Sequence, residues 1–433
     1  MTKPTTRRIE VGALTRVEGE GALQVEVVGD RVDRVNLAIY EPPRFFEALL
    51  VGRPLEDVPD VTARICGICP IAYQNTSVFA LEQALGIEVT PEIQQIRRLL
   101  YCAEWIESHA LHIHLLNIPD FFNCSSSIDL AKQYPEEVNR GLRLKKHGNE
   151  LLEILGGRAV HPINITVGGF YRAPPRQQLL ALVEDLKWGL DASIDVARWV
   201  ADFEFPDFTQ PYEMVALRHP TEYPMNHGRI VSTAGLDIDV RQYEEHFEER
   251  QVEHSTALHA VRVPEGQPYF VGPLARINQN LDRLSPIARQ LADDVGITWP
   301  CFNPYQSIVA RAIEVVQAYD ESIRIINEYQ PPGVARIEYE PREGEGMAAT
   351  EAPRGLIFHR YKTDRHGRIT AAKIVPPTSQ NQGQIEQDLR ELLPGLLQHE
   401  DRDIAIRCEK LIRTYDPCIS CSTHFLKLDL KRR

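Results

Sequence analysis

Two pairs of cysteines near opposite ends of the chain constrain its fold more than any other feature of the sequence. The first pair is Cys66 and Cys69, and the second pair is Cys418 and Cys421. Two residues between the cysteines of a pair let the chain turn back, so that both sulfurs can face one metal ion. Four thiolates suit zinc, an iron–sulfur cluster or nickel. If both pairs hold one site, the fold must bring the two ends of the 433-residue chain together.

The spacing leaves other interpretations open. Zinc ribbons place their cysteine pairs about 15–20 residues apart, whereas these pairs lie about 350 residues apart. A zinc ion that joins the two ends of a long chain remains an alternative. Each pair could also act alone as a redox dithiol, although neither pair follows the strand of a βαβ unit. The other four cysteines are scattered, and we expect them to be buried in the core. They are Cys102, Cys124, Cys301 and Cys408.

Composition and charge exclude several classes of function. The formal net charge is −13, and no Lys/Arg-rich stripe is present, so a nucleic-acid-binding surface is not expected. No apolar stretch reaches the about 20 residues that a membrane-spanning helix needs. Residues 1–8 lack the apolar core of a secretory signal. We therefore expect a cytoplasmic protein without a membrane span.

Hydrophobic periodicity predicts a mainly α fold with small antiparallel β-sheets, an α+β class. Apolar residues alternate on both sides of Gly29 and Asp30, which predicts a β-hairpin. A second hairpin is expected at 355–361 and 369–375. Helical spacing predicts helices at 45–50, 91–116, 135–155, 175–203, 307–329 and 384–393.

No linker divides the chain, so we expect one unit over residues 1–433. Within it, 1–60 should be rich in β-structure and 61–350 largely helical. Residues 351–424 should form a hairpin, a helix and a C-terminal metal-binding segment.

The motifs around the cysteines resemble those of one known family. They are Arg-Ile-Cys-Gly-Ile-Cys at 64–69 and Asp-Pro-Cys-Ile-Ser-Cys-Ser-Thr-His at 416–424. Together they look like the paired signature of nickel–iron hydrogenase large subunits. Further blocks fit the same family in the expected order: Arg-Val-Glu-Gly at 16–19, Glu-Ser-His-Ala-Leu-His at 107–112, Gly-Arg-Ala-Val-His at 157–161, Gly-Gly-Phe at 168–170, Glu-Ala-Pro-Arg-Gly at 351–355 and Val-Pro-Pro-Thr-Ser-Gln-Asn at 375–381. The resemblance therefore spans nearly the whole chain.

This resemblance implies a nickel–iron centre. Cys66 and Cys418 would be terminal nickel ligands, and Cys69 and Cys421 would bridge nickel and iron. In this family the iron also carries one carbon monoxide and two cyanides. The implied reaction is the reversible heterolytic oxidation of dihydrogen.

Five polar residues acquire roles from the same resemblance. Arg354 would donate towards one cyanide and Thr378 towards the other, while Asp120 and Asp416 would surround that arginine. Glu18 would take the proton from the Cys418 sulfur. Without the resemblance, each residue has an ordinary interpretation. Glu18 could be an exposed glutamate at the end of a strand, Asp416 could start a turn before Pro417, and Arg354 could be a surface charge.

The resemblance also implies a magnesium site and a processed C-terminus. Glu47 and His424 would bind magnesium, although imidazole is an unusual magnesium ligand and His424 could simply be buried. A maturation protease would cut after His424 and remove residues 425–433. The alternative is that these residues stay on the surface.

The electrons must leave through partner proteins. The sequence has no further cysteine cluster for an iron–sulfur centre, so a small iron–sulfur subunit should supply it. The C-terminal motif and the segment 42–47 look most like the cytoplasmic NAD(P)-linked group, whose diaphorase subunits would carry FAD and bind NAD(P).

The chain departs from the family pattern at three positions. Tyr73 stands where many members have a histidine that supports a bridging sulfur, and Glu20 and Gln380 are smaller departures. Tyrosine can donate a hydrogen bond but cannot become cationic near pH 7. Two rival functions are a quinone-site subunit related to respiratory complex I, which lacks the four cysteines, and a zinc-stabilised subunit without catalytic activity.

Overall fold

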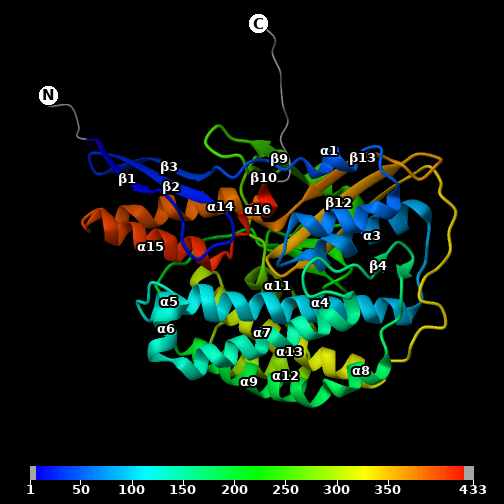
Figure 1. Ribbon diagram of the computed structural model, residues 1–433. Helices are drawn as coiled ribbons and strands as arrows, with labels where there is room; N and C mark the ends of the chain where they lie inside the picture. The colour runs from blue at the N-terminus through cyan, green and yellow to red at the C-terminus, as the bar shows by residue number, and fades with distance from the viewer. Residues whose placement is uncertain (1–5, 424–433) are drawn as a thin grey trace, which may run out of the picture.

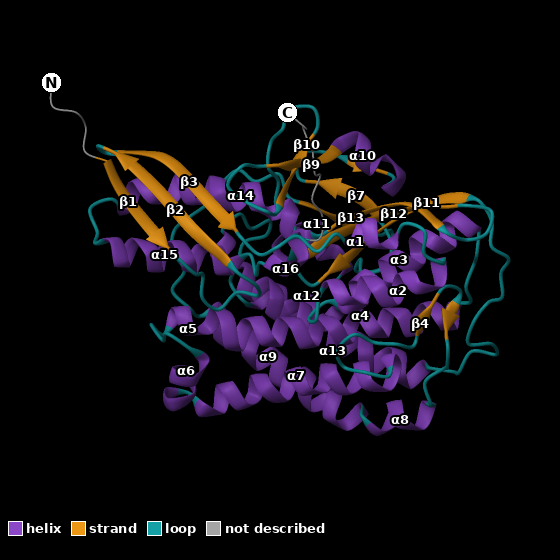
Figure 2. Cartoon of the chain, turned by 45° about the horizontal axis from the view of Figure 1, so that its top comes forward, coloured by secondary structure: helices purple, strands orange, loops and turns teal. Residues whose placement is uncertain are grey.

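The computed structural model describes residues 6–423, in which a layer of long helices lies beneath several small sheets (Figure 1). Figure 2 shows the same division, with most of the strands above the long helices and β4 beside α4. The predicted α+β class with small antiparallel sheets is confirmed. Strands β4 to β10 fall inside the segment 61–350, so this segment is not purely helical.

The α-helices, in chain order, are α1 (Phe46–Leu50), α2 (Val58–Thr62), α3 (Pro70–Leu85), α4 (Pro91–Leu111), α5 (Ile118–Phe121), α6 (Ser127–Gln133), α7 (Pro135–Gly156), α8 (Arg176–Ala181), α9 (Val183–Ala201), α10 (Tyr243–His246), α11 (Pro273–Asn280), α12 (Pro286–Asp294), α13 (Ser307–Glu328), α14 (Pro377–Leu392), α15 (Asp401–Thr414) and α16 (Ile419–Ser422). A π-helical stretch, His112–Asn117, continues α4. Short 3₁₀ turns include Ala63–Ile65, which leads into Cys66.

The strands are β1 (Thr6–Val11), β2 (Gly21–Val28), β3 (Arg31–Ile39), β4 (Ile165–Thr166), β5 (Gly169–Phe170), β6 (Val215–Arg218), β7 (Arg229–Ser232), β8 (Asp237–Ile238), β9 (Phe247–Gln251), β10 (Leu258–Arg262), β11 (Gly344–Ala352), β12 (Gly355–Thr363) and β13 (Ile369–Val375). They pair antiparallel in the orders β1-β2-β3, β4-β5, β6-β7-β8, β10-β9 and β11-β12-β13.

The helical layer packs around α4, which contacts both α7 and α13. The Thr90 hydroxyl accepts a hydrogen bond from the Ile93 amide and so caps the start of α4. Gly148 lets α7 approach closely, because a methyl group there would lie 2.7 Å from the Glu107 amide nitrogen. The middle of α4 is thereby fixed beneath the sheets.

Helix α3 connects the sheets to the helical layer, since it packs against β11 and β12. A side chain at Gly346 in β11 would collide with the Ala80 carbonyl oxygen of α3. Glu104 of α4 accepts hydrogen bonds from the amides of Ile71 (2.6 Å) and Ala72 (3.2 Å), which satisfies two free amides in the first turn of α3. The residue just before that turn is Cys69.

Both predicted hairpins and most of the predicted helices are confirmed. The first hairpin is β2–β3 and the second is β12–β13. The helix expected at 175–203 is divided into α8 and α9, and the one expected at 384–393 begins earlier, at Pro377. The elements that were not predicted include helices α3, α11, α12 and α15 and strands β1 and β11. Cys102, Cys124, Cys301 and Cys408 are buried, as expected.

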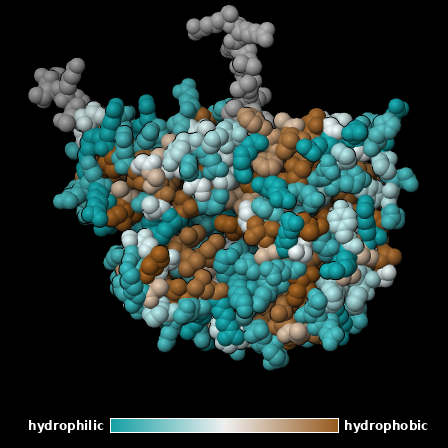
Figure 3. All heavy atoms as spheres, viewed as in Figure 1, coloured by the Kyte–Doolittle hydropathy of each residue, from teal (hydrophilic) through white to brown (hydrophobic). Residues whose placement is uncertain are grey.

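Among residues 6–423, no helix is long and apolar enough to cross a membrane. On the face drawn in Figure 3, hydrophobic side chains are interspersed with hydrophilic ones.

Candidate metal centre

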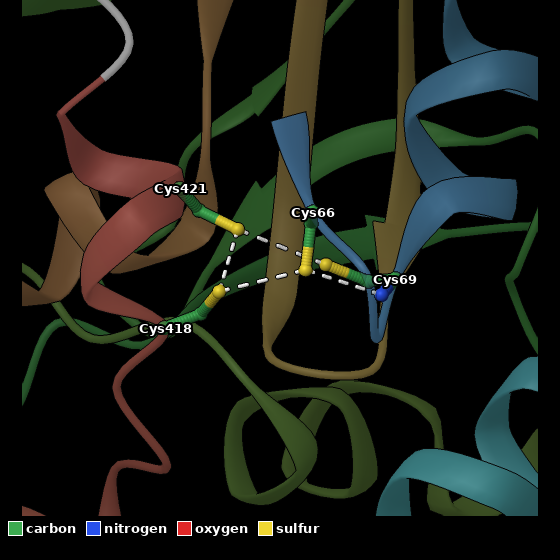
Figure 4. Close-up of side chains that lie close together, drawn as sticks. All are labelled: Cys66, Cys69, Cys418 and Cys421. Carbon is green, nitrogen blue, oxygen red and sulfur yellow. Dashed lines mark hydrogen bonds between the residues drawn. The ribbon is translucent and has the colours of Figure 1, made fainter. Parts of the chain in front are cut away.

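The four paired cysteines, far apart in sequence, lie together in the structure. Cys66 follows a 3₁₀ turn and Cys69 is the residue before α3, while Cys418 precedes α16 and Cys421 lies within it. Figure 4 shows the side chains of the two pairs pointing toward one another from opposite segments.

The sulfur atoms form a compact buried group. The Cys66 and Cys418 sulfurs lie 3.5 Å apart, and those of Cys69 and Cys421 lie 3.9 Å apart. All four ligand atoms lie within 4.8 Å of one another, and no disulfide joins them. Each residue is at most 3% exposed. This donor set fits one metal site with four thiolate ligands.

The two thiols of the C-terminal pair resist ionisation in the metal-free chain. Burial raises the pKa of the Cys418 and Cys421 thiols, which opposes their ionisation. A metal ion supplies the positive charge that lets such buried thiols become thiolates.

Two backbone contacts hold the C-terminal pair against the N-terminal part of the chain. The Ile419 amide donates to the Glu18 carbonyl oxygen (2.9 Å), and the Arg44 amide donates to that of Thr423 (2.9 Å). The Arg44 side chain also donates to the carbonyl oxygens of Ile65 and Ser420, so it joins the segments that carry the two pairs. Sequence reasoning missed Arg44, because its partners are backbone atoms distant in sequence.

The Glu18 carboxylate lies beside the centre. Its Oε2 accepts hydrogen bonds from the Cys418 thiol (3.1 Å) and from the Ser420 amide (3.1 Å). The Ser420 hydroxyl in turn donates to Glu41 Oε2 (3.0 Å). A second carboxylate therefore stands next to Glu18, and Glu41 was not identified from the sequence.

Arg354 and Asp416 lie near the cysteines as a buried ion pair. Arg354, in the turn between β11 and β12, donates through Nη2 to Asp416 Oδ1 (3.0 Å) and through Nε to the Asp416 carbonyl oxygen (2.7 Å). Its Nη1 atom is buried and has no hydrogen-bond partner among residues 6–423. Burial raises the pKa of Asp416, and Arg354 opposes that rise. The open Nη1 donor fits an acceptor supplied by a bound group.

Asp120 binds other arginines. It accepts two hydrogen bonds from Arg413, each 2.8 Å, and one from Arg16 Nη2 (2.5 Å). In the part of the chain that the structure describes, no hydrogen bond joins Asp120 to Arg354. Asp120 therefore links the loop that contains Arg16 to α15, which precedes the second cysteine pair.

Thr378 and Tyr73 also lie near the four paired cysteines. Thr378 Oγ1 accepts a hydrogen bond from the Cys418 amide (3.1 Å), which leaves its own proton available to donate. Tyr73, on α3 one turn after Cys69, is fully buried, and its hydroxyl has no hydrogen-bond partner among the described residues. Nearby thiolate charge adds to burial in raising its pKa.

Glu47 lies on α1 and is 6% exposed. It accepts a hydrogen bond from the Ile374 amide (2.7 Å), and burial raises its pKa to about 8. His424 and residues 425–433 lie outside the described residues, so the expected magnesium pair and the cleaved extension are not tested.

Comparisons with known proteins identify similar chains. The family described as nickel-dependent hydrogenase matches residues 44–140 and 240–424. Subunit alpha of sulfhydrogenase 1 from Pyrococcus furiosus is 32% identical, over 97% of this chain and 98% of that protein. Subunit alpha of sulfhydrogenase 2 from the same organism is 34% identical, over 97% of this chain and 100% of that protein.

Solved structures share the fold. A crystal structure of an NAD+-reducing [NiFe]-hydrogenase in the H2-reduced state superposes with a TM-score of 0.88 at 24% identity, over 97% of this chain and 100% of that one. The [NiFeSe]-hydrogenase of Dm. baculatum gives a TM-score of 0.79 at 22% identity, with the same coverage.

Proposed function

Because the chain belongs to the nickel-dependent hydrogenase family, we propose that it is the catalytic subunit that oxidises dihydrogen reversibly to protons and electrons. The observation that carries this proposal is the buried group of four thiols, assembled from both ends of the chain beside the Glu18 carboxylate. A purely structural zinc site needs four sulfurs but has no need of an acid in contact with one of them.

The residues present fit a nickel–iron group. Cys66 and Cys418 would hold nickel as terminal ligands, and Cys69 and Cys421 would be shared with iron. The open Nη1 donor of Arg354 suits one cyanide. When bound, the group would act as a Lewis acid towards dihydrogen, which makes a proton removable by a nearby base.

The Thr378 hydroxyl suits the second cyanide, because it lies against Cys418 and keeps its proton available. The iron would also carry one carbon monoxide.

Glu18 is the base that receives the proton in this account. Glu18 Oε2 lies 3.1 Å from the Cys418 sulfur, so a proton placed on this sulfur would pass directly to the carboxylate. Ser420 links Glu18 to a second carboxylate, because its amide donates to Glu18 and its hydroxyl donates to Glu41.

Arg354 and Asp416 position the centre by electrostatics. They are 2% and 3% exposed, so a guanidinium charge is fixed beside the thiolates without mobile water. Asp120 would affect the centre only indirectly, because its hydrogen bonds hold Arg413 and Arg16 and not Arg354.

The electrons require partner proteins. Among residues 6–423 the paired cysteines are the one cysteine group close enough to bind a metal, so an iron–sulfur subunit would accept the electrons. The similarity to subunits named alpha and to an NAD+-reducing hydrogenase supports a small iron–sulfur subunit, with diaphorase subunits that use FAD and NAD(P) beyond it.

Glu47 and His424 would bind magnesium and fix the C-terminus after a protease removes residues 425–433. Glu47 is a buried carboxylate, and carboxylate oxygens are among the ligands that magnesium prefers.

The cysteine ligands can be tested by substitution. Cys66→Ser should abolish dihydrogen uptake and nickel incorporation, because it removes one of four thiolates. Cys301→Ser is the matched control, since Cys301 is buried but lies outside the group. Retention of nickel and activity by Cys66→Ser would refute the ligand assignment. Stoichiometric zinc, with neither nickel nor iron in the mature wild type, would favour the structural site instead.

A further inference from the structure

We propose that His254, His259 and Glu386 form a second metal site, which binds a borderline divalent transition ion such as Zn²⁺. None of the four paired cysteines takes part, so this inference does not rest on the proposed hydrogenase function.

The three side chains come from separate parts of the chain. His254 lies between β9 and β10, His259 lies in β10, and Glu386 lies in the middle of α14. One ligand atom from each lies within 4.8 Å of the other two. His254 Nε2 is 2.6 Å from Glu386 Oε1, and the two imidazole centroids are 5.7 Å apart.

His259 gives an independent reason to expect a ligand. The residue is 6% exposed, and its Nε2 atom is buried without a hydrogen-bond partner among residues 6–423. A buried imidazole nitrogen with no partner costs free energy, because it has lost its contact with water. Coordination of an ion by this imidazole would remove that cost.

The donor set selects the class of ion. Two imidazoles and a carboxylate suit zinc and other borderline divalent ions, whereas magnesium prefers oxygen ligands. Zinc sites with three protein ligands take water as the fourth ligand. The side chain of His254 is 24% exposed, which gives that water and the entering ion a path from solvent.

The ion would replace an interaction that already exists. Zinc–ligand bonds of about 2.0–2.2 Å require the three donors to converge on one point, and side-chain rotation can provide this. In the metal-free chain, the proton between His254 and Glu386 holds two of the donors together. An entering ion displaces that proton and adds His259.

The position of the site indicates a stabilising role. Glu386 Oε1 also accepts a hydrogen bond from the Leu37 amide of β3 (2.8 Å). An ion would therefore join three segments: the N-terminal sheet, the β9–β10 hairpin and α14. Thr378, which contacts the Cys418 amide, lies in the first turn of the same helix. The second site would help to fix the helix that carries Thr378.

Calorimetric titration with Zn²⁺ tests the site directly. The probe is ZnCl₂ added to the purified, nickel-loaded complex after loosely bound metal has been removed. We expect one equivalent to bind in the wild type. His259→Gln and Glu386→Gln should each weaken this binding by more than about 100-fold, beyond the range for residues that only support ligands. His246→Gln, on neighbouring α10, is the matched control and should bind normally.

A second pair of measurements guards against misfolding and against binding at cysteine. His254→Gln changes a partly exposed side chain, so it should fold normally and still lose the site. Co²⁺ bound in place of Zn²⁺ should give visible ligand-field bands without the near-ultraviolet thiolate charge-transfer band. The inference is overturned if the wild type binds no Zn²⁺, if binding persists in all three variants, or if the charge-transfer band appears.

Discussion

Replacing Glu18 by glutamine separates its role in proton transfer from its role in the structure. Glutamine keeps the size of the side chain and an oxygen that can accept from the Cys418 thiol and the Ser420 amide, both now 3.1 Å away. It cannot take up a proton. We therefore expect Glu18→Gln to assemble and to incorporate nickel, but to exchange protons slowly.

The expected effect on the exchange rate and the expected effect on folding stability distinguish these roles. Loss of a general acid–base group typically lowers a rate by about 10²–10⁴-fold, which corresponds to roughly 3–5 kcal/mol in the activation barrier. In the structure, Glu18→Gln exchanges a charged acceptor for a neutral one in two partly buried hydrogen bonds. Such a change costs about 1 kcal/mol of folding stability for each bond. The kinetic effect should thus exceed the effect on stability.

The assay is hydrogen–deuterium exchange between D2 gas and water, measured by mass spectrometry on enzyme of known nickel content. Glu20→Gln is the matched control, because Glu20 is exposed and lies two residues away on the same loop. Exchange should fall at least about 100-fold per nickel in Glu18→Gln and stay normal in the control. Wild-type exchange per nickel in Glu18→Gln would refute the role assigned to this carboxylate.

Three further predictions concern other parts of the molecule. Tyr73→Phe removes a buried hydroxyl that has no partner among residues 6–423, so urea unfolding of the metal-free chain should show no loss of stability. A loss above about 1 kcal/mol would show that the Tyr73 hydroxyl makes a hydrogen bond. Burial raises the pKa of Asp388 from 3.8 to about 6, so the free energy of unfolding should fall as the pH rises from about 4 to 6. Asp388→Asn should reduce this pH dependence, whereas an unchanged pH dependence would exclude Asp388 as its source. If the C-terminal extension is removed during maturation, the intact mass of active protein should end at His424, whereas a mass that includes Arg433 would contradict processing.

The two cysteine pairs could be identified in the sequence because each pattern is local, and the resemblance to the family implied that the pairs form one centre. Each pair is held within a four-residue turn, and the alternating apolar residues of β2 and β3 reveal one buried face. Helix α3 was not predicted, because its sequence shows no clear local pattern. It is buried on nearly all sides, including the polar residues Gln74 and Asn75, so it shows little amphipathic pattern.

Partners distant in sequence could not be predicted from the chain alone. Asp120 was expected beside Arg354, yet its hydrogen bonds go to Arg16 and Arg413, which the fold brings from near the two ends of the chain. Strand β11 was missed because it contains glycine and alanine, whose small size at Gly346 serves the close contact with α3. These features depend on tertiary packing rather than on local preference.

We propose that cysteines from both ends of the chain hold one nickel–iron site. X-ray absorption at the nickel edge, on purified and active protein, tests it most directly because the spectrum reports the atoms bound to nickel. We expect a first shell of sulfur atoms from Cys66, Cys69, Cys418 and Cys421, with iron as the next metal neighbour. A first shell made only of nitrogen and oxygen, or no iron neighbour, would contradict it.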